Sequence, residues 1–207
     1  MIMMKMVIAT GNANKMREIR EIFSDLHLEI VSMKEAGAEA DPEETGTTFE
    51  ENSLIKARAV KAALVEKGEG NTLVLADDSG LEIDALNKAP GVLSARFMGH
   101  DTSYDVKNAA LLEKLEGVPE EKRTARFVCA ISCILSDGTE LVERGTMEGK
   151  IGHEIAGENG FGYDPIFIPD GYSVSSAVIS PEEKNAISHR GKALRAVYSE
   201  LLDRFGR

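Results

Sequence analysis

The stretch that decides the fold is TARFVCAISCILSDGTELVERGTMEGKI, residues 124–151. The odd-numbered positions from Phe127 to Leu135 are apolar, and the opposite side of the same segment is largely apolar as well. A strand that is buried on both faces lies inside a sheet rather than at its edge. Asp137-Gly138 then supplies a two-residue turn, so residues 140–151 are predicted to return as an antiparallel partner.

Helices and strands alternate on both sides of this hairpin. Apolar runs predict further strands at residues 5–10, 26–32, 72–76 and 166–168. Helical spacing predicts helices at 15–23, from about 47 to 67, from about 102 onward, after residue 180 and in the C-terminal segment. The helix ending at Lys67 starts with a capping box, made either by Thr47 and Glu50 or by Thr48 and Glu51. We therefore predict an α/β fold with a mixed parallel and antiparallel central sheet flanked by helices.

Length and composition limit the organisation of the chain. With 207 residues, of which 43% are hydrophobic, the chain forms one domain over 1–207 or two lobes that share a core. Cys129 and Cys133 lie four residues apart in one predicted strand, about 13 Å from each other. A disulfide needs Cα atoms within about 7 Å, so we expect reduced thiols and a cytoplasmic protein.

Charge and hydropathy argue against two classes of partner. The net charge is −11, which opposes binding to a phosphate backbone, because such binding depends on neutralisation by Lys and Arg. No stretch approaches the length of a membrane span. We therefore expect neither a nucleic acid nor a membrane as partner.

A first candidate site is the turn from Thr10 to Lys15, with the sequence TGNANK. It joins the end of a predicted strand to the start of a helix, where free backbone N–H groups and the helix dipole attract anions. The spacing matches neither a P-loop nor a dinucleotide fingerprint. An ordinary strand–turn–helix connection with Asn14 as N-cap explains the same residues.

A second candidate is a set of acidic pairs. Glu43-Glu44 precede a glycine turn, and Asp77-Asp78 follow the apolar strand TLVLA. Carboxylates at the end of a strand lie where α/β sheets bind ligands, and adjacent acids repel each other unless a cation relieves the repulsion. Mg²⁺ accepts one or two carboxylates together with substrate phosphates. A polar turn without a metal explains Asp77-Asp78-Ser79-Gly80 equally simply.

A third candidate is the loop NGFGYDP, residues 159–165, in which Phe161 and Tyr163 alternate with glycines. Flanking glycines allow an aromatic ring to lie against a planar base, and Asp164 could bind a base edge. Two aromatic residues that simply pin the loop to the sheet are the alternative.

A fourth candidate is KNAISHR, residues 184–190, which places Lys184, His189 and Arg190 between two predicted helices. These side chains can present cations and hydrogen-bond donors to a ligand. A helix cap or a surface histidine explains His189 as well. Neither a Ser–His–Asp arrangement nor a zinc-ligand spacing is visible.

The four motifs together, in this order, resemble the inosine/xanthosine triphosphate pyrophosphatase family. The resemblance rests on TGNANK, EETGTTFEEN, ADDSGLEIDAL, APGVLSARF, GFGYDPIF and EKNAISHRGKAL, and it covers residues 7–197. It implies two lobes with a substrate cleft between them, usually in a homodimer. It also implies Mg²⁺-dependent hydrolysis of ITP, dITP and XTP to the nucleoside monophosphate and pyrophosphate, which cleanses the nucleotide pool.

The resemblance also implies roles for individual residues. Asp78 would be the catalytic proton acceptor and a metal ligand, and either Glu43 or Glu44 would be the second metal ligand. The substrate-binding residues would be Thr10, Gly11, Asn12, Ala13, Asn14, Lys15, Lys56, Ser79, Phe161, Gly162, Tyr163, Asp164, Lys184, His189 and Arg190. Donors from Lys184, His189 and Arg190 would bind the 6-oxo group of the base and disfavour a 6-amino group. How guanine is rejected does not follow from the sequence.

Two other functions remain as alternatives. A nucleotide-binding regulator without catalysis would have lost the acidic residues, which are present here. A pyrophosphatase for modified pyrimidines would differ only in its substrate profile.

Overall fold

The chain divides into two compact units. The structure is a computed structural model that describes residues 4–24 and 28–205. Unit 1 consists of the described parts of Met1–Asp78, Cys129–Arg144 and Arg190–Arg207, and unit 2 consists of Ser79–Val128 and Gly145–His189. The long strands β3 (Leu73–Ile83), β4 (Thr124–Ile134) and β5 (Glu140–Ile151) contribute residues to both units.

The six-stranded sheet is mixed, as predicted. Its strand order is β2-β1-β3-β4-β5-β6, with β1 at Met4–Ile8, β2 at Leu28–Ser32 and β6 at Phe167–Pro169. Strand β1 pairs in parallel with both β2 and β3, whereas β5 pairs antiparallel with β6. The neighbours β4 and β5 are joined by residues 135–139, which is too short for a parallel crossover, so this pair is the predicted hairpin. Residues 26 and 27 of the predicted second strand lie outside the described residues.

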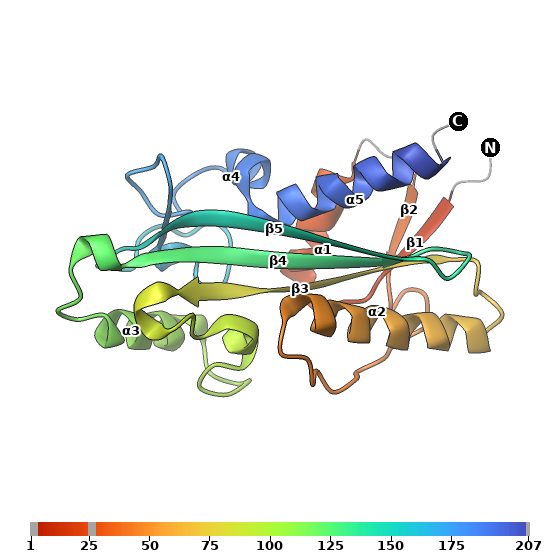
Figure 1. Ribbon diagram of the computed structural model, residues 1–207, viewed down its shortest axis with the longest axis horizontal. Coiled ribbons are helices and arrows are strands. Elements are labelled where there is room, and N and C mark those ends of the chain that lie inside the picture. Colours follow the sequence, from red (N-terminus) through yellow and green to blue (C-terminus); the bar gives the residue numbers. More distant parts are fainter. Residues whose placement is uncertain (1–3, 25–27, 206–207) are drawn as a thin grey trace. The chain divides into compact units, whose positions relative to one another are not determined.

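Unit 1 has helices on both faces of its strands (Figure 1). Helices α1 (Ala13–Ile22) and α5 (His189–Phe205) cover one face, and α2 (Phe49–Glu66) covers the other. The period of two along each strand sorts the side chains: Leu73 and Leu75 pack with α1 and α5, while Val74 and Ala76 pack with α2. Each of the residues 73–76 in β3 therefore packs against a defined helix.

Most helix starts follow the sequence signals. The capping box of α2 is the one made by Thr48 and Glu51. Helix α4 (Pro181–Ile187) begins after residue 180 as predicted, and Ser180 Oγ accepts a hydrogen bond from the backbone N–H of Glu183 at 3.1 Å. Helix α3 (Tyr104–Lys114) begins close to the predicted start near residue 102 and is capped by Ser103.

Unit 2 has its own core around the second half of β3. Leu81 and Ile83 pack with residues from α3, β4, β5 and the 163–167 segment. Gly80 is required here, because a Cβ atom at this position would lie 2.4 Å from the carbonyl oxygen of Gly91. Ser94 completes the contact, since its hydroxyl accepts from the backbone N–H of Leu81 at 2.9 Å and donates to Gly91 at 2.6 Å.

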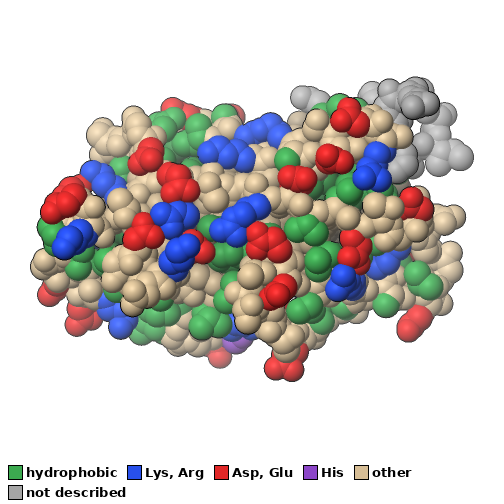
Figure 2. Space-filling model, viewed as in Figure 1, with side chains coloured by type: hydrophobic (Ala, Val, Ile, Leu, Met, Phe, Trp, Pro, Cys, Tyr) green, Lys and Arg blue, Asp and Glu red, His purple; other side chains and the backbone are tan. Residues whose placement is uncertain are grey.

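Basic side chains are interspersed with acidic ones on the face shown in Figure 2. In unit 2, for example, Arg126 contacts Glu148 at 2.8 Å and Asp84 at 3.0 Å. This face therefore lacks an unbroken stripe of Lys and Arg over the residues that the structure describes. Among the same residues, no helix combines the length and the apolarity that crossing a bilayer requires.

The two cysteines are predicted to be unreactive in the folded protein. Cys129 and Cys133 are free thiols with no exposed surface, and burial raises the pKa of Cys133 to about 12, although Lys61 lowers it. Thiolate, the reactive form, is therefore scarce at about pH 8. Ellman's reagent should react slowly with native protein and should titrate both thiols after unfolding in guanidinium chloride. Rapid reaction of either thiol in the native protein would contradict this packing.

Candidate active site

The acidic pair Asp77-Asp78 lies inside strand β3 rather than after its end. The prediction that the strand stops at Ala76 is wrong, because β3 continues to Ile83. Alternation along the strand turns Asp77 toward the α1/α5 face and Asp78 toward the α2 face. The two carboxylates therefore face opposite sides of the sheet, and their direct ion-pair partners differ.

Asp77 is fully buried between two cations of unit 1. Its Oδ2 lies 2.7 Å from Nε of Arg190, its Oδ1 lies 2.5 Å from Nζ of Lys15, and the thiol of Cys129 donates to Oδ2 at 3.2 Å. Burial alone would raise the pKa of Asp77, but the positive charges of Arg190 and Lys15 outweigh it and hold this pKa well below its usual range. Asp77 is therefore an ionised structural carboxylate.

Asp78 has a different environment. Its Oδ1 accepts from Nζ of Lys56 at 2.7 Å, whereas its Oδ2 is buried and has no hydrogen-bond partner among the described residues. Burial raises the pKa of Asp78, and this effect outweighs the attraction of Lys56 and Lys15. A buried carboxylate oxygen without a donor is costly unless a ligand, a cation or water completes its coordination. One carboxylate oxygen of Asp78 is therefore available to a ligand or a metal ion.

Glu44 is the member of the Glu43-Glu44 pair that approaches this site. Its Oε1 lies 3.3 Å from Nζ of Lys56, whereas Glu43 is exposed. The loop is held by Asn52, whose side-chain oxygen accepts from the backbone N–H of Gly46 at 2.8 Å. Asp78 and Glu44 thus supply carboxylate oxygens on either side of one lysine.

This donor set fits Mg²⁺. The residues that the structure describes contain no group of three or more His, Cys, Asp or Glu side chains able to hold a metal ion. Mg²⁺ takes one or two carboxylates and completes its octahedron with water and phosphate oxygens. Two carboxylates, one of them with an uncoordinated buried oxygen, suit a cation that arrives together with a phosphorylated substrate.

The Thr10–Lys15 turn is organised by Asn12, not by Asn14 as predicted. The side-chain oxygen of Asn12 accepts from the backbone N–H groups of Asn14 at 2.9 Å and Lys15 at 3.2 Å. Thr10 Oγ1 in turn accepts from the backbone N–H of Asn12 at 3.1 Å. The turn is thus preorganised, and the ammonium of Lys15 is held beside Asp77.

In unit 2, Asp164 organises the aromatic loop rather than presenting a free carboxylate. Its Oδ2 accepts from the backbone N–H of Phe161 at 2.8 Å and from Nζ of Lys184 at 2.6 Å, and its Oδ1 accepts from Ser176 at 2.8 Å. Gly160 has a φ of +74°, and a Cβ atom there would lie 2.2 Å from Asp164 Oδ2. Both glycine and aspartate are therefore needed to shape this loop.

The two aromatic residues of the loop have different environments. Phe161 is half-buried, with Nζ of Lys184 lying 5.3 Å from its ring centroid. Tyr163 is buried, donates its hydroxyl to the carbonyl of Ser94 at 2.7 Å and packs edge-on against Tyr104. Tyr163 thus packs in the core of unit 2, and its contact with the base stays a prediction.

The structure separates the two residues of the His189-Arg190 pair. The ring of His189 stacks on Phe127, with centroids 4.9 Å apart and an interplanar angle of 13°. The guanidinium of Arg190 is buried against Asp77 and Glu18. Two carboxylates engage donors of Arg190 in this structure, and its contact with the base stays a prediction.

Several residues of these sites were not singled out from the sequence. Asn52 shares a helix face with Lys56, four residues away, and this spacing is a usable signal. Phe127 was identified only as a core residue of the hairpin, and Glu18 only as part of a helix. The Glu18–Arg190 pair joins residues 172 positions apart, which a single sequence does not reveal.

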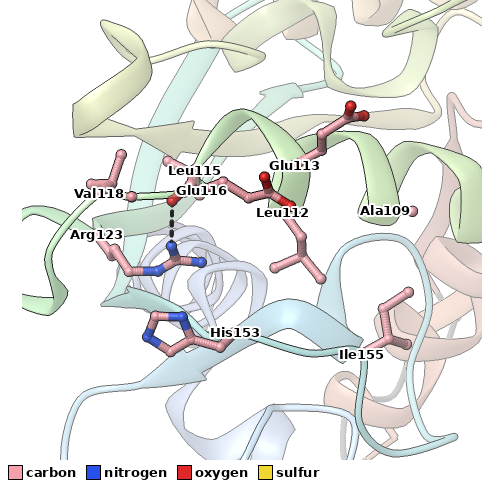
Figure 3. A pocket seen from close by; sticks show the side chains of 10 residues that line it. Ala109, Leu112, Glu113, Leu115, Glu116, Val118, Arg123, His153 and Ile155 are labelled. Atoms are coloured by element: carbon pink, nitrogen blue, oxygen red, sulfur yellow. Dashed lines mark hydrogen bonds between the residues drawn. The ribbon is translucent and has the colours of Figure 1, made fainter.

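A cavity of about 520 Å³ in unit 2 is lined by none of the predicted site residues (Figure 3). Arg123 lies in its wall, but the guanidinium donates to the backbone carbonyls of Leu115 at 2.8 Å and Ile151 at 2.9 Å. Arg123 therefore ties the end of α3 to the end of β5. The cavity is wide enough for a small molecule, but the chemistry described above lies elsewhere.

The two groups of residues belong to kinds that bind nucleotides. Unit 1 supplies lysines and carboxylates suited to phosphate and a divalent cation, and unit 2 supplies a partly exposed aromatic ring suited to a base. The chain is thus an α/β protein in which each unit carries a candidate binding site.

Comparison with known proteins identifies the family. The model of the Ham1 family matches residues 6–200, and the chain belongs to that family. A Clostridium perfringens protein called dITP/XTP pyrophosphatase is 45% identical over 199 residues, covering 96% of this chain and 98% of the relative. A Caldanaerobacter subterraneus protein of the same name is 47% identical over 202 residues, covering 98% of each.

Solved structures agree with this assignment. A HAM1 protein from Coxiella burnetii has a TM-score of 0.85 and 39% identity, covering 97% of this chain and 100% of its own. The Staphylococcus aureus Ham1 protein has a TM-score of 0.84 and 40% identity, covering 97% and 99%. The family resemblance drawn from the sequence motifs is confirmed.

The pKa of Asp77 is lowered and that of Asp78 is raised, so removing the charge of each residue should change the stability of the fold in opposite directions. Because the folded-state pKa of Asp77 lies below the unfolded value of about 3.9, its ionisation stabilises the fold above that pH, and this stabilisation is lost as the pH falls through the folded-state pKa. Asp77→Asn removes the buried charge that Lys15 and Arg190 share and leaves Glu18 as the counter-charge of Arg190, so it should lower the free energy of unfolding by about 3–5 kcal/mol at neutral pH. The difference from wild type should shrink below about pH 4.

Asp78→Asn is the matched control. Since the pKa of Asp78 is raised, its ionisation opposes folding at neutral pH, so the neutral side chain should unfold at the same or a higher denaturant concentration. Urea unfolding at several pH values measures both variants. Equal stability of Asp77→Asn and wild type would contradict the assignment of Asp77 as a structural carboxylate.

Proposed function

We propose that the protein hydrolyses non-standard purine nucleoside triphosphates, namely ITP, dITP and XTP, to the nucleoside monophosphate and pyrophosphate. The observation that carries this proposal is Asp78, whose buried Oδ2 lacks a partner among the described residues beside Lys56 and Glu44. The relatives named dITP/XTP pyrophosphatase, which match nearly the full chain, support the reaction and the substrate class.

The triphosphate is bound by the cationic residues of unit 1. Lys15 and Lys56 supply the positive charges, and the preorganised turn Thr10–Lys15 supplies donors from its backbone and side chains. A preset ammonium costs little reorganisation when the phosphate arrives, so it contributes more to binding than a free side chain would. Ser79, which follows Asp78 in β3, lies beside the substrate.

Asp78 and Glu44 would hold Mg²⁺. When bound, Mg²⁺ neutralises charge on the triphosphate. We favour Glu44 over Glu43 as the second ligand, because Glu44 lies beside Lys56 and Glu43 is exposed.

Asp78 orients the attacking water and accepts its proton. The raised pKa makes this carboxylate a better proton acceptor than an exposed aspartate. The water oxygen forms a bond to the α-phosphorus, and the bond from this phosphorus to the oxygen bridging it to the β-phosphorus breaks. Pyrophosphate leaves with that oxygen, and Lys15 and Lys56 stabilise the negative charge that develops on it.

The base is bound by residues of unit 2. Phe161 supplies a half-buried ring for stacking, and Gly162 and Asp164 shape the loop that holds it. Lys184, His189 and Arg190 are the candidates for donors to the 6-oxo group. A site that presents donors disfavours a 6-amino group, because the donors would stay unpaired.

Three further points belong to the same proposal. Residues 1–207 act as a single two-lobed domain, the domain forms a homodimer, and the protein works in the cytoplasm. The family resemblance supports the first two points, and the free, buried thiols are consistent with a reducing compartment.

A nucleotide panel tests the function directly. With Mg²⁺, we expect ITP, dITP and XTP to be cleaved with a kcat/KM far above that of ATP, GTP and modified pyrimidine triphosphates. The products should be monophosphate and pyrophosphate in equal amounts.

Asp78→Asn should remain folded but lose turnover by about 10²- to 10⁴-fold, the usual contribution of a general base. Orthophosphate and a nucleoside diphosphate as products, or near-normal activity of Asp78→Asn, would contradict the proposal.

Phe161 and Tyr163 provide a second, internally controlled test. Stacking accepts any base and contributes about 1–3 kcal/mol, so Phe161→Ala should lower kcat/KM for ITP and ATP by similar factors of roughly 5 to 150. Tyr163→Phe removes only the hydrogen bond to Ser94, so it should lower stability by about 1 kcal/mol and leave the KM for ITP unchanged. The reverse pattern in steady-state kinetics would assign base stacking to Tyr163.

A further inference from the structure

Three successive ion pairs link four charged residues of unit 1 whose signs alternate, and because helix α1 carries both ends of this series we call it the ring. Helix α1 presents Lys15 and Glu18, three residues apart and hence on one side of the helix. Lys15 contacts Asp77, Asp77 contacts Arg190, and Arg190 contacts Glu18. The ring therefore joins the first turn of α1 to strand β3 and to the first turn of α5.

Burial in the ring is graded. The side chains of Asp77, Arg190 and Glu18 are 0%, 2% and 7% exposed, whereas that of Lys15 is 15% exposed. Buried charges are tolerated only when they are paired, and the four charges of the ring sum to zero. Lys15 is thus the most exposed member of the ring and the one that can contact a ligand directly.

We propose that Glu18 is a positioning residue for triphosphate binding, acting through Arg190 and Asp77 on the ammonium of Lys15. The proposal rests on the proposed function in one respect, namely that Lys15 binds a phosphate of the substrate. Glu18 itself is buried against Arg190 and takes no part in the chemistry.

The physical reason is a competition for Asp77. With Glu18 ionised, Arg190 divides its donors between two carboxylates, and Asp77 keeps one oxygen for Lys15. With Glu18 neutral, the ring carries an excess positive charge, and Arg190 draws more strongly on Asp77. The ammonium of Lys15 is then held less firmly, so part of the phosphate affinity is lost to ordering it again on binding.

The experiment measures the affinity of inorganic tripolyphosphate with Mg²⁺ by titration calorimetry, because this probe lacks a base and a sugar. Glu18→Gln keeps the size and hydrogen-bonding capacity of the side chain and removes its charge. It should weaken tripolyphosphate binding roughly fivefold or more, within the range of coupling inside one ion-pair network. Glu21→Gln, on the same helix but 45% exposed, is the matched control and should leave the affinity unchanged.

A double-substitution cycle separates positioning from a purely structural role. In the background of Lys15→Met, Glu18→Gln should change the affinity by less than about twofold, because the group through which Glu18 acts is gone. The same loss in both backgrounds, or no loss in wild type, would overturn the proposal. Absence of ITP hydrolysis by wild type would instead refute the proposed function, and it is measured independently of the tripolyphosphate titration.

Discussion

The ion pairs of Asp77 with Arg190 and Lys15 are the interaction on which the rest of the site depends. An ionised carboxylate with no exposed surface is stable only when cations surround it, and here the two cations come from α5 and the turn before α1. Asp77 therefore fixes both segments against strand β3. Because side chains alternate along a strand, the same placement turns Asp78 toward α2 and Lys56.

The buried carboxylates of Asp77 and Asp164 are fully engaged, whereas that of Asp78 is not. Asp77 is neutralised by two cations, and Asp164 has both oxygens satisfied by Lys184, Ser176 and a backbone N–H. Such groups organise the structure and offer little to a ligand. Asp78 keeps one buried oxygen without a partner among the described residues, which is the condition expected of a group that completes its coordination with substrate, cation or water.

Local patterns were sufficient to predict the hairpin, the mixed sheet and the capping boxes, because each depends on a few neighbouring residues. Local patterns failed where contacts between residues far apart in the sequence determine the structure. Strand β3 continues through Ser79-Gly80, two residues that favour a turn, since Gly80 fits closely against Gly91. Phe161 and Tyr163 both adjoin Gly162, yet only the ring of Tyr163 is buried, because it packs in the core of unit 2. Likewise, the partner of Arg190 on α1 lies 172 residues away.

The central claim is that Asp78, and not its neighbour Asp77, serves the ligand and its cation. The most direct measurement is the shift of the melting temperature on adding Mg²⁺ with an ITP analogue whose α–β bridge is a methylene group. A ligand that binds only the native state raises this temperature, and at a fixed ligand concentration the rise increases with the logarithm of its affinity. The account predicts a clear rise for wild type and little or none for folded Asp78→Asn. A full rise in Asp78→Asn would contradict it.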